Sequence, residues 1–179
     1  MKATGIVRRI DDLGRVVIPK EIRRTMRIRE GDPLEIYTDR EGEVIFKKYS
    51  PIGELASFAS QYVETLYKTC QMAVIVTDRD SVIASAGISR REYLDRKLSE
   101  DFENIIEGRA MYSHKQGAPE ISIVEGGASL IKYAMPIISD GDIVGCIASV
   151  YTGNDQGENP TEAKLIQTAG AFLGRQFEG

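Results

Sequence analysis

The first 50 residues of this chain are too few to make a stable domain from one copy. They predict short strands at residues 4–10 and 15–18, a helix at 20–27, and a hairpin of strands at 34–38 and 43–49. This segment contains no cysteine to form a disulfide and no cluster of metal ligands. The stability of domains of this size is marginal unless a disulfide, a bound metal or an oligomer supports them. We therefore expect residues 1–50 to dimerise, with strands of the two chains interleaved.

The rest of the chain predicts a larger α+β domain that begins with a long helix. Residues 51–70 form this connector helix, and its apolar residues recur at spacings of three and four: Ile52, Leu55, Ala59, Tyr62 and Leu66. The helix packs on its own sheet, pairs with a second subunit, or does both. Residues 71–179 supply about five strands, at 72–77, 82–86, 120–124, 129–138 and 143–151, and helices at 90–97, 100–108 and 160–177.

Composition excludes several classes of protein. No stretch approaches the roughly 20 apolar residues that span a bilayer, and charged residues interrupt the N-terminus where a signal peptide would be apolar. We therefore expect a cytoplasmic protein with no membrane partner. Cys70 and Cys146 lie far apart in apolar contexts, which favours two free, buried thiols.

Residues with catalytic chemistry are sparse. His114 is the only histidine and lies in a polar loop, where a solvated or hydrogen-bonded role is expected. One histidine and two distant cysteines cannot make an ordinary zinc site, and the paired aspartates fall in turns, where Asp is favoured for backbone reasons. We expect no enzyme activity, no catalytic residue, no metal and no bound cofactor.

Charge is divided unevenly along the chain. The whole chain has a net charge of −4, yet residues 1–50 hold 12 Lys and Arg against 9 Asp and Glu, whereas residues 51–179 hold 11 against 18. On the predicted helix, Lys20, Arg23, Arg24 and Arg27 follow one stripe, with Ile22 and Met26 on the opposite, buried face. The basic side chains Arg8, Arg9 and Arg15 precede it. A solvated helix face balanced by acids is the alternative, but Glu21 and Glu30 are too few. Arginine suits phosphates and guanine edges, so the pattern favours a DNA-binding surface, doubled in a dimer.

Residues 3–24, with Gly-Arg-Val-Val-Ile-Pro at their centre, resemble the AbrB family of bacterial transition-state regulators. The resemblance covers about residues 1–50 and implies a swapped-hairpin β-barrel dimer that binds double-stranded DNA. The family's DNA-contacting arginines match Arg8, Arg15, Arg23 and Arg24 here. The charge pattern adds Arg9 and Lys20 to the predicted site.

Residues 52–179 resemble a GAF domain, an α/β fold that senses small ligands, through the order of their elements. The signature of cyclic-nucleotide-binding GAF domains is missing, so an effector, if one binds, belongs to another class. The two halves together resemble nucleoid-associated regulators that activate and repress sporulation genes, and they imply a tetramer of paired dimers. Two alternatives stay open: an antitoxin-like module that binds a protein toxin, since swapped-hairpin domains also serve as antidotes, and a GAF-containing enzyme.

Overall fold

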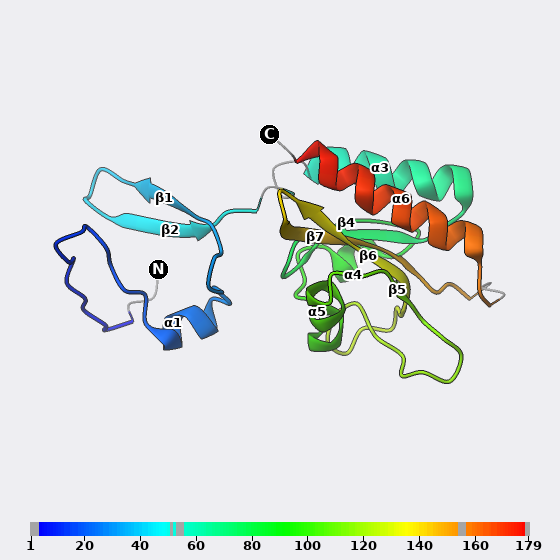
Figure 1. The fold of residues 1–179 in the computed structure, drawn as a ribbon, viewed down its shortest axis with the longest axis horizontal. Helices are drawn as coiled ribbons and strands as arrows, with labels where there is room; N and C mark the ends of the chain where they lie inside the picture. The colour runs from blue at the N-terminus through cyan, green and yellow to red at the C-terminus, as the bar shows by residue number, and fades with distance from the viewer. Residues whose placement is uncertain (1–3, 51, 53–55, 154–156, 178–179) are drawn as a thin grey trace. The chain divides into compact units, whose positions relative to one another are not determined.

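The chain divides into two compact units, Met1–Tyr49 and Ser50–Gly179. The structure is a computed structural model, and it describes residues 4–50, 52, 56–153 and 157–177. Figure 1 shows the elements of each unit.

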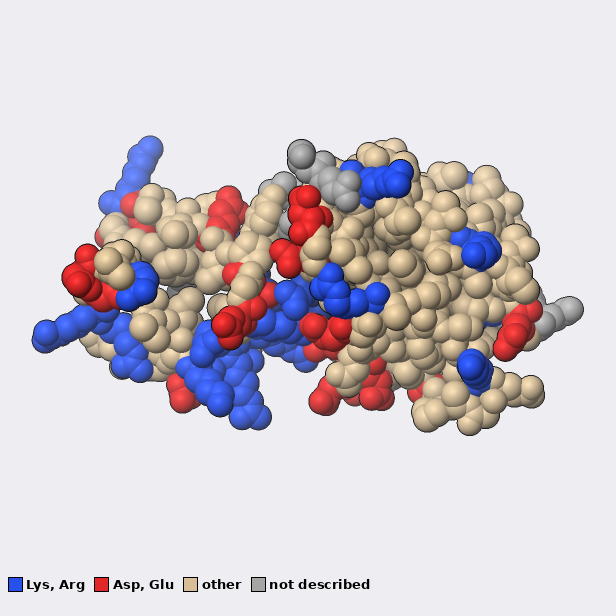
Figure 2. Space-filling model, in the orientation of Figure 1, with Lys and Arg blue, Asp and Glu red and all other residues tan. Residues whose placement is uncertain are grey.

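The described residues of the N-terminal unit form one short helix and one hairpin. Helix α1 spans Lys20–Thr25, and strands β1, Leu34–Thr38, and β2, Val44–Lys48, pair antiparallel. Asp39 shapes the turn between the strands, because its Oδ1 accepts hydrogen bonds from the backbone N–H groups of Glu41 and Glu43 at 3.0 and 2.9 Å. The hairpin therefore forms as predicted. Strand β1 has the predicted bounds, and β2 is one residue shorter at each end than predicted. Lys and Arg side chains gather over the region of α1 (Figure 2).

Residues 4–10 and 15–18 are not strands in the described chain, contrary to the prediction. Between them, the N–H of Asp11 donates to the carbonyl of Arg15 at 3.0 Å, and this bond belongs to a turn. An extended segment becomes a strand only when its backbone groups pair with a neighbour. The described part of this single chain provides no neighbouring strand that pairs with either segment.

One face of the hairpin is apolar and exposed. The register places Ile36 opposite Phe46 and Thr38 opposite Val44, and these side chains share a face because alternate residues point the same way. Ile36 is 62% exposed, Val44 58% and Phe46 43%. The opposite face carries polar contacts, including the Lys47 ammonium 4.3 Å from the centre of the Tyr37 ring. A soluble unit does not ordinarily leave so much contiguous apolar surface uncovered.

The C-terminal unit is built on a five-stranded antiparallel sheet with strand order β4-β3-β7-β6-β5. The strands are β3 Val74–Thr77, β4 Val82–Ala86, β5 Tyr112–Ser113, β6 Ile131–Ser139 and β7 Asp142–Val150. The helices are α3 Ala56–Cys70, α4 Arg90–Tyr93, α5 Glu100–Glu107 and α6 Pro160–Gln176. Helices α3 and α6 lie side by side on one face of the sheet, and α4 and α5 lie on the other (Figure 1).

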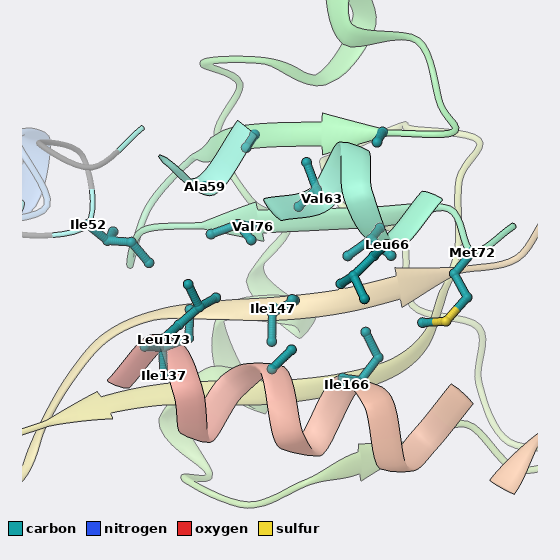
Figure 3. Packing of buried hydrophobic residues seen from close by; sticks show 14 of the residues in the cluster. Ile52, Ala59, Val63, Leu66, Met72, Val76, Ile137, Ile147, Ile166 and Leu173 are labelled. Carbon is teal, nitrogen blue, oxygen red and sulfur yellow. The ribbon is translucent and has the colours of Figure 1, made fainter. Parts of the chain in front are cut away.

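The two faces of the sheet bury separate apolar clusters. Under α3 and α6, Val63, Ile166 and Leu173 point towards Val76 and Ile147 of the sheet (Figure 3). On the other face, Phe102 and Ile106 of α5 pack with Ile75, Leu98 and Ile123, among other residues. Each fully buried aliphatic or aromatic side chain contributes about 1.5–3 kcal/mol from apolar burial. This unit therefore has the core that the N-terminal unit lacks.

Several sequence predictions for this unit were wrong in detail. The helix predicted at 90–97 ends at Tyr93, because Leu94 is extended and Asp95 takes a φ of +60°. Residues 120–124 make isolated bridges instead of a strand, and β5 was missed because two residues carry no periodicity. Cys146 is buried as predicted, but Cys70 is exposed at the end of α3. Leu55 lies outside the described residues.

Candidate nucleic-acid interface

A tight turn at residues 11–15 fixes the position of Arg15. Gly14 takes a φ of +76°, a conformation that glycine adopts without strain. The carboxylate of Asp11 closes the turn: Oδ1 accepts from the N–H of Leu13 at 3.0 Å and from the N–H of Arg15 at 2.7 Å, while Oδ2 contacts the Arg15 Nε at 2.8 Å. The Arg15 guanidinium is thus held at an exposed loop tip.

The same bonds perturb Asp11. The hydrogen bonds from the backbone and then the side chain of Arg15 lower the pKa of Asp11 below its usual value of 3.8. Both favour the charged form, because an ionised carboxylate is the better acceptor and attracts the guanidinium. Asp11 is a positioning residue that the sequence analysis missed. The sequence signal for this role is the spacing of Asp11 and Arg15, which stand four residues apart with Gly14 between them.

Helix α1 holds three of the six predicted residues on one side. Pro19 precedes it with a φ of −56°, suited to a helix start, and its carbonyl accepts from the Arg23 N–H at 2.9 Å. Lys20, Arg23 and Arg24 then stand at spacings of three and four, which share one helix face.

The helix is shorter than predicted, and this changes the stripe. It ends at Thr25, and Arg27 takes a φ of +52°, so Arg27 leaves the face that carries Arg23 and Arg24. The Lys48 Nζ of β2 donates to the Arg27 carbonyl at 2.9 Å, and this bond links the segment after α1 to the hairpin. Of the predicted buried face, Ile22 is half-buried, whereas Met26 is 60% exposed.

All six predicted residues are exposed: Arg8, Arg9, Arg15, Lys20, Arg23 and Arg24. They fall on three successive features of the N-terminal unit, the extended segment before the turn, the turn and α1. Lys and Arg side chains crowd the surface around α1 in Figure 2. Contact between these six side chains and DNA stays a prediction.

The described residues of the C-terminal unit place its single histidine in a hydrogen-bonded position and hold no cluster of metal ligands. His114 is half-buried and hydrogen-bonded, with Nδ1 2.9 Å from the Tyr151 hydroxyl and Nε2 3.3 Å from the Ala118 carbonyl. No three His, Cys, Asp or Glu side chains in the described ranges are grouped to hold a metal ion. None of the helices, as far as they are described, is long and apolar enough to cross a membrane.

Two family models match the chain. The model described as stage V sporulation protein T C-terminal, transcription factor, matches residues 54–178. The model described as antidote-toxin recognition MazE, bacterial antitoxin, matches residues 7–53.

Curated relatives match each half. Stage V sporulation protein T of Bacillus subtilis (strain 168) is 49% identical over 180 residues, which cover 99% of both chains. The transition state regulatory protein AbrB of the same strain is 65% identical over 51 residues, which cover 28% of this chain and 52% of AbrB.

Among solved structures, the GAF domain/HD domain protein from Geobacter sulfurreducens matches with a TM-score of 0.50 and 14% identity. The match covers 73% of this chain and 95% of that one. The cyanobacteriochrome receptor PixJ matches with a TM-score of 0.53 and 14% identity over 72% of this chain and 98% of its own. At these identities the matches show the fold alone.

These findings confirm the predicted fold class, an AbrB-like N-terminal domain followed by a GAF-like domain. They also favour the transcription-factor interpretation over the antitoxin-like module, because the full-length relative is matched end to end. This chain therefore belongs to the stage V sporulation protein T family of transcription factors.

Proposed function

We propose that this protein binds double-stranded DNA sequence-specifically and regulates sporulation genes, activating some and repressing others. The observation that carries the proposal is the exposed basic surface of the N-terminal unit, with three cationic residues on α1 and Arg15 fixed on the turn before it. The contacting residues are Arg8, Arg9, Arg15, Lys20, Arg23 and Arg24. The same protein acts in the cytoplasm, at the nucleoid, and has no catalytic activity of its own.

The N-terminal units of two chains form the DNA-binding dimer. The exposed apolar face of the β1–β2 hairpin supports this, because a second chain would cover it. The segments 4–10 and 16–18 support it too, because they form no strand in the described chain and strands from a partner would pair with their backbone. A symmetric dimer presents two copies of the basic surface, which suits a DNA site with two-fold symmetry.

A second contact between C-terminal units gives the tetramer. Tyr62 of α3 stacks with Phe58 of the same helix and with Phe172 of α6, with ring centres 6.2 and 5.7 Å apart, and the Phe58 and Phe172 rings lie tilted at 6.3 Å. Phe172 is 41% exposed, so this aromatic cluster reaches the surface of the two-helix layer. The GAF-like unit is the sensor. A signal that moved the connector helix would change the spacing of two DNA-binding dimers.

Salt dependence of DNA binding tests the proposal. The logarithm of affinity falls by about 0.9 per neutralised phosphate for each logarithmic unit of salt. If all six residues of both chains in a dimer contact phosphate, the slope is about −11. Changing Arg23→Ala and Arg24→Ala together removes four charges per dimer and should reduce the slope by about 3.6.

The measurement uses fluorescence anisotropy on a duplex selected from a random-sequence pool, with a shuffled duplex as reference. The matched control changes Arg90→Ala and Arg91→Ala, two adjacent arginines of α4 on the acidic unit. We expect this control to leave the slope unchanged. Equal slopes for the native protein and the Arg23/Arg24 variant, or no preference for the selected duplex, would refute the proposal.

A further inference from the structure

A groove of about 650 Å³ lies in the C-terminal unit, where α3 ends and α6 begins. Its lining includes side chains from both helix ends, the β6 strand and the chain before α6: Tyr67, Cys70, Lys132, Glu158, Asn159 and Glu162. The apolar residues Met72, Ala73 and Val150 also border it. Small-molecule sites usually measure 300–1,000 Å³, so the groove has the size of one. Met72 belongs to the apolar cluster under α3 and α6, whereas Ala73 and Val150 belong to the cluster on the α4–α5 face.

The groove is bordered by a buried ion pair. The Lys132 Nζ is 2.9 Å from the Glu162 Oε2, and the two side chains are only 3% and 8% exposed. The ammonium also lies 5.5 Å from the centre of the Tyr151 ring. A buried pair loses much of its attraction to desolvation, and an apolar pair of the same volume is often as stable. The attraction that this pair provides between α6 and β6 therefore does not by itself explain why a buried lysine and a buried glutamate border the groove.

The pair offers both signs of charge at a fixed separation. In an α-amino acid, the ammonium nitrogen and the nearer carboxylate oxygen are about 3 Å apart, because only two covalent bonds separate the nitrogen from the carboxyl carbon. Such a zwitterion can lie antiparallel to the protein pair, with its carboxylate towards Lys132 and its ammonium towards Glu162. Attraction between such charges is stronger where water is excluded.

The surroundings favour the same orientation. Glu158 adds a second, exposed carboxylate for the ammonium. Tyr67 forms a wall for an apolar side chain. It rests against Gly87, where a Cβ would come within 2.8 Å of the Tyr67 ring.

We propose that this groove binds a small zwitterion of the α-amino acid class, held by the Lys132–Glu162 pair. The proposal rests on the sensing role proposed above for the C-terminal unit. Binding there would act on the end of the connector helix α3 and on the start of α6, the two elements of the helical layer.

Cys70 supplies a built-in probe of the groove. It is exposed and lines the groove, whereas the only other cysteine, Cys146, is buried with its thiol pKa raised by desolvation. Reaction of the native full-length protein with a chromogenic disulfide therefore reports Cys70. We would measure this rate, and the melting temperature, with each of the free L-amino acids and without DNA.

The expected result is that at least one amino acid slows the Cys70 reaction several-fold and raises the melting temperature. A ligand at about 100 times its Kd raises the ratio of folded to unfolded protein about 100-fold. Acetate and methylamine together should do neither, because the two charges are then not joined. Glu162→Gln and Lys132→Met should each abolish the effect.

A further variant keeps the test decisive if those two proteins fail to fold. Cys70→Trp fills the groove from an exposed position and should abolish the thermal shift. The matched control Thr65→Trp, exposed on α3 outside the groove lining, should keep it. No amino acid effect, an equal effect of acetate with methylamine, or a shift that survives Cys70→Trp would overturn the inference. DNA binding is measured separately, so either proposal can fail alone.

Discussion

Two glycines of α6 provide a graded test of how this helix packs on the sheet. A Cβ on Gly174 would approach the backbone carbonyl oxygen of Ile138 far closer than the 3.0 Å below which real Cβ atoms essentially never occur. A Cβ on Gly170 would lie 2.5 Å from the Cγ of Met135, part of a flexible side chain. The same added methyl group therefore meets rigid backbone at one site and a movable thioether chain at the other.

The magnitudes follow from these two neighbours. Gly174→Ala must push the end of α6 away from β6 by about 1 Å, and overpacking of this kind costs about 1–3 kcal/mol. Alanine returns up to about 1 kcal/mol through its higher helix propensity, so we expect a net loss of about 1–2 kcal/mol in the free energy of unfolding. Gly170→Ala should be within about 1 kcal/mol of the native protein, because Met135 can change rotamer.

Differential scanning calorimetry of the C-terminal transition measures both changes. The expected loss for Gly174→Ala lowers Tm by about 3–8 °C in a unit of this size. Protein concentration must be held constant, since assembly contributes to apparent stability. Gly153→Ala, with nothing within 4 Å of the added Cβ, is the control and should leave Tm unchanged. If Gly174→Ala matched or exceeded the native Tm, or fell less than Gly170→Ala, the packing described here would be wrong.

Two further predictions concern the N-terminal unit. The lowered pKa of Asp11 means that its contribution to stability is present above its unfolded pKa, near 3.8, and is lost as the pH falls through the lower folded value. A carboxyl titration followed by NMR should place its midpoint below 3.8, and Arg15→Ala should raise that midpoint; an unchanged midpoint would contradict the ion pair. Ile36→Asp should weaken dimerisation in analytical ultracentrifugation by about 2 kcal/mol or more per chain, because the dimer would bury an unpaired charge. Glu35→Gln, on the opposite hairpin face, should leave dimerisation unchanged. If Ile36→Asp does not weaken the dimer, the apolar face that carries Ile36 is not the interface.

The local pattern of the chain was sufficient for most of its secondary structure. Strands β1 and β4 have the predicted bounds, and α6 ends within one residue of its prediction. Errors fall where conformation depends on a partner in space. Arg27 lies outside α1, although the helix was predicted to reach it, because its backbone is left-handed. Its carbonyl accepts a hydrogen bond from Lys48, 21 residues away.

The candidate DNA surface was also legible in the sequence, because charge and helical spacing are local properties. Arg23 and Arg24 stand on one face of α1 whatever surrounds it. The role of Asp11 required the structure, since its bonds to Arg15 depend on the turn that Gly14 permits.

By itself, then, the sequence determined the division into a basic and an acidic part, the kinds of element in each, and the cationic residues of α1, since these depend on neighbours within a few positions. Only the tertiary structure decided which apolar faces are covered and which are left bare on the hairpin. It alone brought Lys132 to Glu162, 30 residues apart, across the gap between a sheet and a helix. The physical reason is that burial and ion pairing are set by distance in space, and the chain reveals that distance only once it has folded.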